Sequence, residues 1–410
     1  MKRPSPQIET NDMEQNRRLQ IFAFPELAPL WIAVFVDILG FSILIPFLPF
    51  FSRQFGALPW QVGLLLSTNA LFGFFSGPIW GRLSDRYGRK PILLICHLGT
   101  MSGFLMLAFS RSMAMLFLSR IVDGIFGGIY PVARAVVGDV TPPSSRSEQM
   151  SNIGVAHVLS SLLGPGVGGL LSRWGIIAPG LFSATLSLIA FLGVLVFVRE
   201  SNPERRTFAR QTIHASENRP PSTGIWRNPT ARTLLIQWAF HTMSFSVYVS
   251  CVSLFASLKL GLNAEQTGVW LTVGGVVRVL VRFIIFVPLL HWLGERKTSF
   301  LGLGIFVISY ALLSLVSKPW EFVGVLCAVS FAAACTRGVL TGFLSRAVRP
   351  WEQGQAMGMS SSLDSLAQIA GPLIGGYVLG AFPTWTYGGI AALFALGAFA
   401  LAFRWIDLES

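Results

Sequence analysis

The sequence predicts an all-helical membrane protein with twelve transmembrane helices arranged as two pseudo-symmetric six-helix bundles. Three observations support this fold class: the composition, the spacing of long apolar segments and an internal repeat. Of 410 residues, 52% are hydrophobic and only 12% are charged, whereas soluble globular chains carry about 25% charged residues. A water-soluble core of this length could not bury so much apolar surface. The composition therefore excludes an ordinary soluble enzyme and a disordered chain.

Twelve segments are long enough to cross a bilayer, because a spanning helix needs about 20 mostly apolar residues. They are 27–51, 60–80, 91–109, 113–133, 150–171, 176–198, 233–256, 266–290, 298–316, 320–345, 356–379 and 384–404. A polar stretch rich in Arg and Pro separates the first six from the last six. The predicted division is a tail at 1–26, a bundle at 27–198, a linker at 199–232, a bundle at 233–404 and a tail at 405–410.

The two halves of the chain repeat each other at a constant offset of 207 residues. Residues 164–169 read GPGVGG and residues 371–376 read GPLIGG. At the same offset Pro143 aligns with Pro350, and Met150 with Met357. Parallel six-helix repeats are a construction used by transporters, with the substrate site near the membrane midplane between them.

The distribution of Lys and Arg predicts the orientation. The tails, the linker and the loops on the same side hold 22 of the 31 basic residues. The opposite loops hold five: Arg53, Arg111, Arg173, Lys259 and Lys318. Basic residues accumulate on the cytoplasmic side, so we expect both termini and the linker to be cytoplasmic. The positive charge thus indicates topology, and we expect no nucleic-acid partner.

Further expectations concern processing and cysteine chemistry. The first 24 residues lack a short apolar core followed by a cleavage site, so the sequence predicts no cleaved signal peptide. All four cysteines lie in apolar segments without metal-ligand spacing. We expect neither a disulfide nor a metal site.

The loop after the second span reads GRLSDRYGRK, which is residues 81–90. Gly81 and Gly88 predict a tight turn, and Asp85 can cap a helix N-terminus or pair with Arg89. The pattern G-x-L-x-D-R-x-G-R-K resembles the loop signature of the major facilitator superfamily, and with the twelve spans the resemblance covers nearly the whole chain. It implies a conformational latch between the halves, formed by Gly81, Asp85, Arg86, Gly88, Arg89 and Lys90 (the latch residues). The alternative interpretation is a positively charged loop that only sets topology.

The fifth span carries Gly164, Pro165, Gly168 and Gly169. Pro165 removes a backbone donor and is expected to bend the helix, while Gly164 and Gly168 form a small-xxx-small face for close packing. The pattern resembles the antiporter signature of the superfamily, which implies proton-coupled export. The alternative is ordinary helix packing, since the eleventh span holds a copy.

Residues 36–40 and 46–49 of the first span and residues 119–128 of the fourth span resemble the twelve-helix drug:proton antiporters, which include the tetracycline exporters. At 1.5 Å per residue, Asp37 and Arg120 lie within about 5 Å of each other in depth. Asp123, three residues from Arg120, shares its face. Charges this deep are functional candidates, and a carboxyl that loses its water or counter-ion takes up a proton more readily. We expect Asp37 to carry the proton first and Asp123 second, with Arg120 modulating both. The alternative is a static ion pair that sets helix packing.

The eighth span contains two arginines four residues apart, Arg278 and Arg282. We hypothesise that Arg278 faces the cavity and contacts an anionic or zwitterionic group of the substrate. The alternative is that Arg278 pairs with Asp364 or with backbone carbonyls. The other substrate-binding candidates are Asp364, Arg337, Trp238, Tyr248 and Phe245, although core or lipid-facing placement is the commoner role for such aromatic residues.

These features together predict a secondary transporter that exports amphiphilic small molecules, such as drugs, in exchange for protons by alternating access. An importer or facilitator of a small organic anion is the alternative, and a receptor or enzyme without transport is a distant one. The sequence lacks an HExxH, a GxSxG and a P-loop, so we expect no enzyme activity. We expect no cofactor, because the proton gradient would drive transport. We expect the protein to be a monomer that crosses the cell membrane several times.

Overall fold

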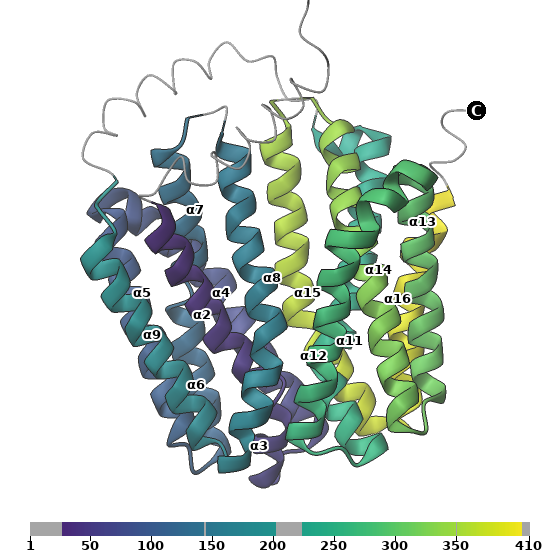
Figure 1. Ribbon diagram of the computed structural model, residues 1–410, viewed down its shortest axis with the longest axis horizontal. Helices are drawn as coiled ribbons and strands as arrows, with labels where there is room; N and C mark the ends of the chain where they lie inside the picture. The colour runs from purple at the N-terminus through teal and green to yellow at the C-terminus, as the bar shows by residue number, and fades with distance from the viewer. Residues whose placement is uncertain (1–26, 143–144, 202–223, 350, 404–410) are drawn as a thin grey trace, which may run out of the picture.

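The computed structural model describes residues 27–142, 145–201, 224–349 and 351–403. These residues form helices that run side by side along one axis (Figure 1). The predicted tails 1–26 and 405–410, and residues 202–223 of the predicted linker, lie outside the described residues.

The helices of the amino-terminal half are α2 (Ala28–Leu44), α3 (Leu48–Gln54), α4 (Pro59–Tyr87), α5 (Arg89–Ala108), α6 (Met113–Ile125), α7 (Ile129–Val140), α8 (Arg146–Leu171) and α9 (Ile177–Phe197). Those of the carboxy-terminal half are α11 (Pro229–Leu260), α12 (Ala264–Leu280), α13 (Phe286–Leu315), α14 (Pro319–Arg346), α15 (Gln353–Ala381) and α16 (Thr386–Phe403). A π-helical segment, η4 (Val281–Ile285), joins α12 to α13.

Local sequence explains where many of these helices begin and end. Pro59, Pro229 and Pro319 occupy the first turns of α4, α11 and α14, where a missing N–H costs nothing. The Asn228 side chain accepts hydrogen bonds from two backbone N–H groups at the start of α11. Gly294, with φ of +76°, interrupts α13 in a conformation that favours glycine.

The described helices are consistent with the predicted twelve spans. By length and composition nine qualify, or ten if α2 and α3, which meet at 44°, count as one broken span. One qualifying segment, Ala264–Leu315, has 52 residues and divides at Gly294 into two of the predicted spans. The twelfth is α15, which is rich in Ser and Gly and therefore less apolar. The expected continuous first span is instead bent near Pro46, which supplies no backbone N–H.

The two halves lie side by side and repeat their packing. In Figure 1 the amino-terminal half occupies the left and the carboxy-terminal half the right. Within the halves, α2 packs on α8 and α11 packs on α15. Between them, α8 packs on α12 and α15 packs on α4. Helices at equivalent positions of the two halves, such as α8 and α15, therefore pack on equivalent neighbours.

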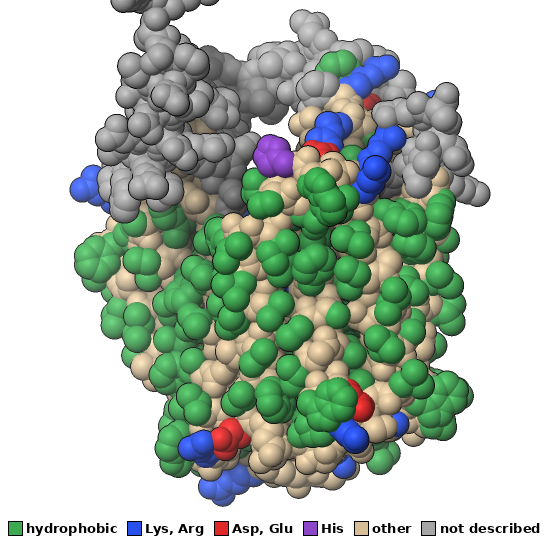
Figure 2. Space-filling view, turned by 45° about the vertical axis from the view of Figure 1, so that its right-hand side comes forward, with side chains coloured by type: hydrophobic (Ala, Val, Ile, Leu, Met, Phe, Trp, Pro, Cys, Tyr) green, Lys and Arg blue, Asp and Glu red, His purple; other side chains and the backbone are tan. Residues whose placement is uncertain are grey.

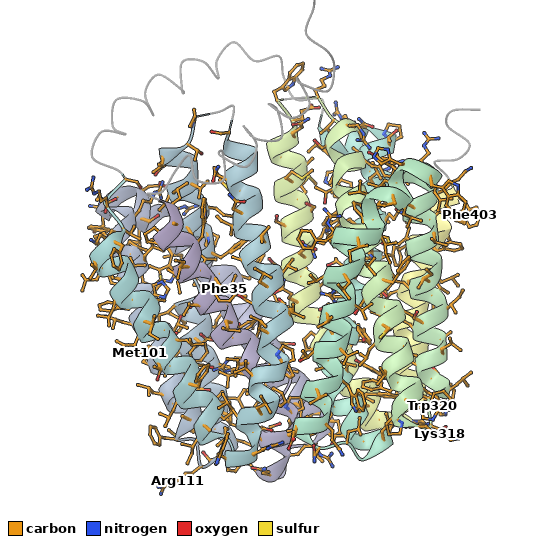
Figure 3. All side chains as sticks on the ribbon, viewed as in Figure 1. Phe35, Met101, Arg111, Lys318, Trp320 and Phe403 are labelled. Carbon is orange, nitrogen blue, oxygen red and sulfur yellow. The ribbon has the colours of Figure 1, made fainter. Side chains whose placement is uncertain are left out.

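The outer surface is that of a membrane protein. Figure 2 shows hydrophobic side chains across the middle of one face, with Lys and Arg near its two ends. Arg111 and Lys318, which the charge distribution predicts on one side of the membrane, lie at the same, lower end (Figure 3). Trp320 lies near Lys318 there and is largely exposed, as expected of an interfacial anchor.

Candidate transport site

Glycines bring α8 into close contact with α2. A Cβ atom added at Gly164 would lie 2.4 Å from the Cβ of Ser42, and one at Gly168 would lie 2.4 Å from the carbonyl oxygen of Ile43. Gly371 on α15, the counterpart of Gly164, packs equally closely on α11, because a Cβ added there would lie 2.4 Å from the hydroxyl of Ser246. The predicted small-xxx-small face is therefore a packing surface in both halves, and α8 continues through Pro165.

The two halves meet closely toward the lower end of the molecule. A Cβ at Gly169 would lie 3.2 Å from the Cα of Gly268, and one at Gly63 would lie 2.2 Å from the carbonyl oxygen of Pro372. The glycine of the predicted antiporter signature thus touches the opposite half. Side chains at these positions would separate the helices.

Polar contacts close the same end. Ser67 donates a hydrogen bond to the carbonyl of Ile369 at 2.6 Å, and Arg53 donates one to Ser257 at 3.2 Å. Arg173 on one half forms an ion pair with Glu265 on the other, and this guanidinium holds the pKa of the Glu265 carboxyl below its usual value. Every hydrogen bond and ion pair that joins described residues of the two halves lies toward this end.

The latch residues are arranged around Arg89, which is buried. Its guanidinium contacts Asp85 at 2.6 Å and Asp139 at 3.0 Å, so Asp85 is paired with Arg89. The backbone N–H groups of Arg89 and Lys90, at the start of α5, donate to the carboxylate of Glu200. Hence Glu200 caps this helix, a role the sequence analysis considered for Asp85.

Gly81 differs from its expected role. The predicted turn involved Gly81 and Gly88, but α4 continues through Gly81 to Tyr87. Only Gly88, with φ of +103°, makes the turn. Nearby, Arg86 lies over the ring of Tyr87, and the ammonium group of Lys90 donates to the carbonyl of Leu195.

Arg120 and Asp123 form a buried ion pair in the amino-terminal half. Their closest atoms are 3.2 Å apart, and the Asn69 amide donates to the same carboxylate oxygen at 2.7 Å. The sequence analysis missed Asn69, although an amide in an apolar span was the available signal. The carboxyl group of Asp37 lies close enough to that of Asp123 for their charges to interact.

The neighbour of Asp37 is His97 rather than Arg120. Asp37 Oδ1 lies 3.8 Å from His97 Nδ1. This oxygen and both ring nitrogens of His97 are buried without a hydrogen-bond partner among the described residues. The expected modulation of Asp37 by Arg120 therefore has no direct contact in this structure, because Asp123 holds the guanidinium. A single histidine in an apolar segment has no spacing pattern that would predict this contact.

Asp364 is the centre of a second polar group in the carboxy-terminal half. One carboxylate oxygen accepts from Arg337 at 2.6 Å. The other accepts from the Trp238 indole at 3.0 Å and the Thr242 hydroxyl at 2.8 Å. Asp364 thus pairs with Arg337, and the alternative pairing with Arg278 is wrong.

Arg278 lies near this group without joining it. Its guanidinium stands 5.6 Å from the centre of the Phe245 ring, and its Nε is buried without a hydrogen-bond partner in the described part of the chain. Tyr248 is buried in the core cluster, with its ring tilted against that of Tyr310. Arg278 lies three residues beyond Gly275, whose added Cβ would lie 2.7 Å from Leu162 of α8, so Arg278 is on the face of α12 toward the opposite half.

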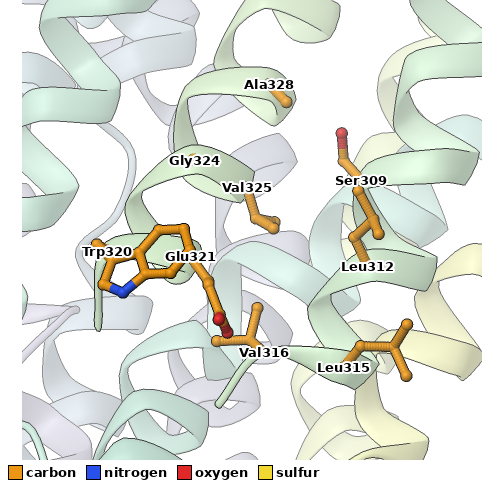
Figure 4. Close-up of a pocket in the computed structure, with 9 residues that line it drawn as sticks. All are labelled: Ser309, Leu312, Leu315, Val316, Trp320, Glu321, Gly324, Val325 and Ala328. Atoms are coloured by element: carbon orange, nitrogen blue, oxygen red, sulfur yellow. The ribbon is translucent and has the colours of Figure 1, made fainter. Parts of the chain in front are cut away.

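A separate pocket of about 460 Å³ lies between α13 and α14 (Figure 4). Leu312, Val316, Trp320 and Val325 contribute to its lining, and Glu321 is its charged residue. The Glu321 carboxylate accepts from the backbone N–H groups of Ser317 and Lys318 and serves as a helix cap. Neither Arg120 and Asp123 nor Arg337 and Asp364 line this pocket, so we do not assign it to transport. No cluster of three His, Cys, Asp or Glu side chains suited to a metal occurs within the described ranges.

Comparisons with known proteins match this architecture. The family model of the Major Facilitator Superfamily matches residues 30–286 and 234–410. Tetracycline resistance protein, class H, of Pasteurella multocida is 28% identical over 348 residues, which cover 84% of this chain and 86% of that protein. Multidrug resistance protein 2 of Bacillus subtilis (strain 168) is 28% identical over 350 residues, which cover 84% and 86%.

Solved structures share the fold. The human organic anion transporter MFSD10 (TETRAN) superposes with a TM-score of 0.67 at 24% identity, over 92% of this chain and 98% of that one. The nucleoside transporter NupG gives a TM-score of 0.69 at 14% identity, over 93% and 98%. At these identities the likeness describes the arrangement of the helices.

Proposed function

We propose that this chain, which belongs to the major facilitator superfamily of membrane transporters, exports amphiphilic small molecules in exchange for protons. The relatives named for resistance to tetracycline and to several drugs support drugs as substrates. We place the protein in the cell membrane as a monomer, with both termini and the linker on the cytoplasmic side.

The observation that carries this proposal is the environment of Asp37. Its side chain is 19% exposed, yet Oδ1 is buried beside His97 without a hydrogen bond among the described residues. An ionised carboxylate with an unpaired buried oxygen costs far more free energy than the neutral acid does. Because part of the group is accessible, a proton can enter and leave. Asp37 would carry this proton, and the Arg120–Asp123 pair would adjust the local charge.

Alternating access would move this site between the two sides of the membrane. We assign the lower end, with Arg111 and Lys318, to the outside. The close contacts between the halves then close the outer side, which makes this the inward-facing state. In it, Arg89 of the latch contacts Asp85 and Asp139 of its own half. We propose that the latch engages the other half when the cytoplasmic side closes.

Proton exchange can be tested by the loss of a pH gradient. Wild-type protein in proteoliposomes should dissipate an imposed gradient when a transported compound is added. A panel of lipophilic cations, zwitterions and anions supplies the compounds. The variant Asp37→Asn should lose this response, because an amide cannot carry the proton. Glu295→Gln is the control, since Glu295 forms an exposed ion pair with Arg346 that contributes little.

Other outcomes would redirect the assignment. A response that survives in Asp37→Asn would move the proton site to Asp123 or Asp364. Labelled compound that crosses without any gradient response would contradict proton exchange.

Import of a small organic anion is the second candidate, and Arg278 favours it. Its guanidinium has no ion pair among the described residues, so a bound anion could supply one. Accumulation of an anion inside right-side-out vesicles, driven by its own gradient and indifferent to pH, would select this function over export.

A further inference from the structure

The polar group of the carboxy-terminal half has more positive than negative charge. Arg278 and Arg337 lie close enough for their charges to interact, and Asp364 is the carboxylate partner of Arg337. Both oxygens of Asp364 already accept hydrogen bonds, from Arg337 on one and from Trp238 and Thr242 on the other. Asp364 therefore has little capacity left to neutralise Arg278.

An unpaired guanidinium inside a membrane protein is costly. Arg278 is fourteen residues into α12, which at about 1.5 Å per residue places it near the middle of the bilayer. Its guanidinium lies over the ring face of Phe245, and such a contact compensates a buried cation only in part. A deep charge of this kind marks a site whose partner is supplied from elsewhere.

The group is accessible, and it faces the opposite half. The Arg337 side chain is 58% exposed although it lies within α14. Arg278 lies on the face of α12 that packs on α8, since a Cβ added at Gly275, three residues earlier, would lie 2.7 Å from Leu162. A molecule lying between the halves can therefore reach them.

The surroundings combine cations with aromatic surface. Arg337 stands 5.5 Å from the centre of the Trp238 ring, and Arg278 stands 5.6 Å from that of Phe245. A guanidinium binds a carboxylate through two parallel hydrogen bonds, and ring faces accommodate a planar apolar body. A lipophilic cation would meet two positive charges here.

We propose that the transported molecules are amphiphilic carboxylates or zwitterions, whose anionic group binds Arg278 and whose apolar body lies against the partly exposed Phe245. This rests on the proposed transport function and adds the substrate class. Arg337, whose side chain is exposed, supplies a second cation near the anionic group.

A matched ligand series on the purified, full-length protein tests the substrate class. The ligands are 2-naphthylacetate, 2-naphthylacetamide, 2-naphthylethylamine and naphthylalanine, which share one ring and differ in charge. Titration calorimetry on wild type should show tightest binding for the acid or the zwitterion. Tighter binding of the amine than of the acid would overturn the proposal without any variant.

Variants then locate the site. Arg278→Gln should weaken the binding of 2-naphthylacetate at least tenfold and change the affinity for 2-naphthylethylamine by less than twofold. Arg278→Lys should recover part of the lost affinity for the acid. The control is Arg282→Gln, one turn further along, where the guanidinium instead lies over Phe286. It should change no affinity more than twofold. Equal weakening of all four ligands in Arg278→Gln would contradict the assignment.

The same ligands separate this proposal from the proton exchange on which it rests. If 2-naphthylacetate enters proteoliposomes without dissipating a pH gradient, the proposed substrate class is supported and proton exchange is overturned. If 2-naphthylethylamine dissipates the gradient and 2-naphthylacetate does not cross the membrane, proton exchange is supported and the proposed substrate class is overturned.

Discussion

Arg120 and Asp123 show how single charges are kept inside a membrane bundle. Both side chains are almost completely buried, and each is the other's counter-charge. Asn69 adds a hydrogen bond to the carboxylate. Breaking such a pair leaves a buried charge without compensation, whereas replacing both residues with apolar ones often costs little.

This pair makes a prediction about stability. Asp123→Ala should destabilise the protein by about 3–5 kcal/mol, because it leaves the Arg120 guanidinium uncompensated. The double variant Arg120→Leu/Asp123→Leu should recover most of that loss. Thermal unfolding of the purified protein in detergent measures both. A double variant that is no more stable than Asp123→Ala would show that the ion pair is not the cause.

At the scale of helices, glycine determines how closely neighbours approach. Gly164 and Gly168 on α8, and Gly371 on α15, each lie where a Cβ would collide with the adjacent helix. Gly154, nearer the start of α8, has nothing within 4 Å of its added Cβ. The requirement for glycine is therefore local to the crossing point.

We expect Gly164→Ala to push α2 and α8 apart and to destabilise the protein by about 1–3 kcal/mol, the usual cost of overpacking. The matched control is Gly154→Ala, which should be neutral or slightly stabilising because alanine favours the helix. Thermal unfolding and transport should be measured on both. Equal effects of the two substitutions would argue against a packing role for Gly164.

At the scale of the whole molecule, the contacts between the halves set the conformational state. Gly63 on α4 approaches the backbone of Pro372 on α15 too closely for any side chain. Arg173 pairs with Glu265 at the other contact between the halves, where α8 meets α12. Exposed ion pairs contribute little, so the helix contact should govern closure more than the charges do.

Gly63→Ala should therefore open this end of the molecule. Spin labels on cysteines introduced at Trp174 and Trp320, in a background lacking the native cysteines, report the distance between the halves. We expect longer distances in Gly63→Ala than in the parent. Gly73→Ala on the same helix is the control, because its nearest contact would be an ordinary 3.8 Å. Unchanged distances in Gly63→Ala would mean that α4 and α15 adjust without separating.

The sequence by itself determined the properties that depend on the chain locally. The apolar segments, the orientation favoured by basic loops and the 207-residue repeat predicted a twelve-helix fold, and the family match confirmed its class. The glycine spacing also predicted close helix faces, since residues four apart share a face whatever the helix packs against. Asp123 beside Arg120 followed from the same rule.

Only the tertiary structure decided which side chains of different helices meet. Helical depth placed Asp37 level with Arg120, but rotation about the helix axes brings His97 to Asp37 instead. Arg337, not Arg278, reaches Asp364 for the same reason. Depth along a helix follows from counting residues, whereas its rotation and tilt follow from packing across the whole bundle. That packing left Arg278 without a counter-charge among the described residues, and so gave the candidate site its excess positive charge.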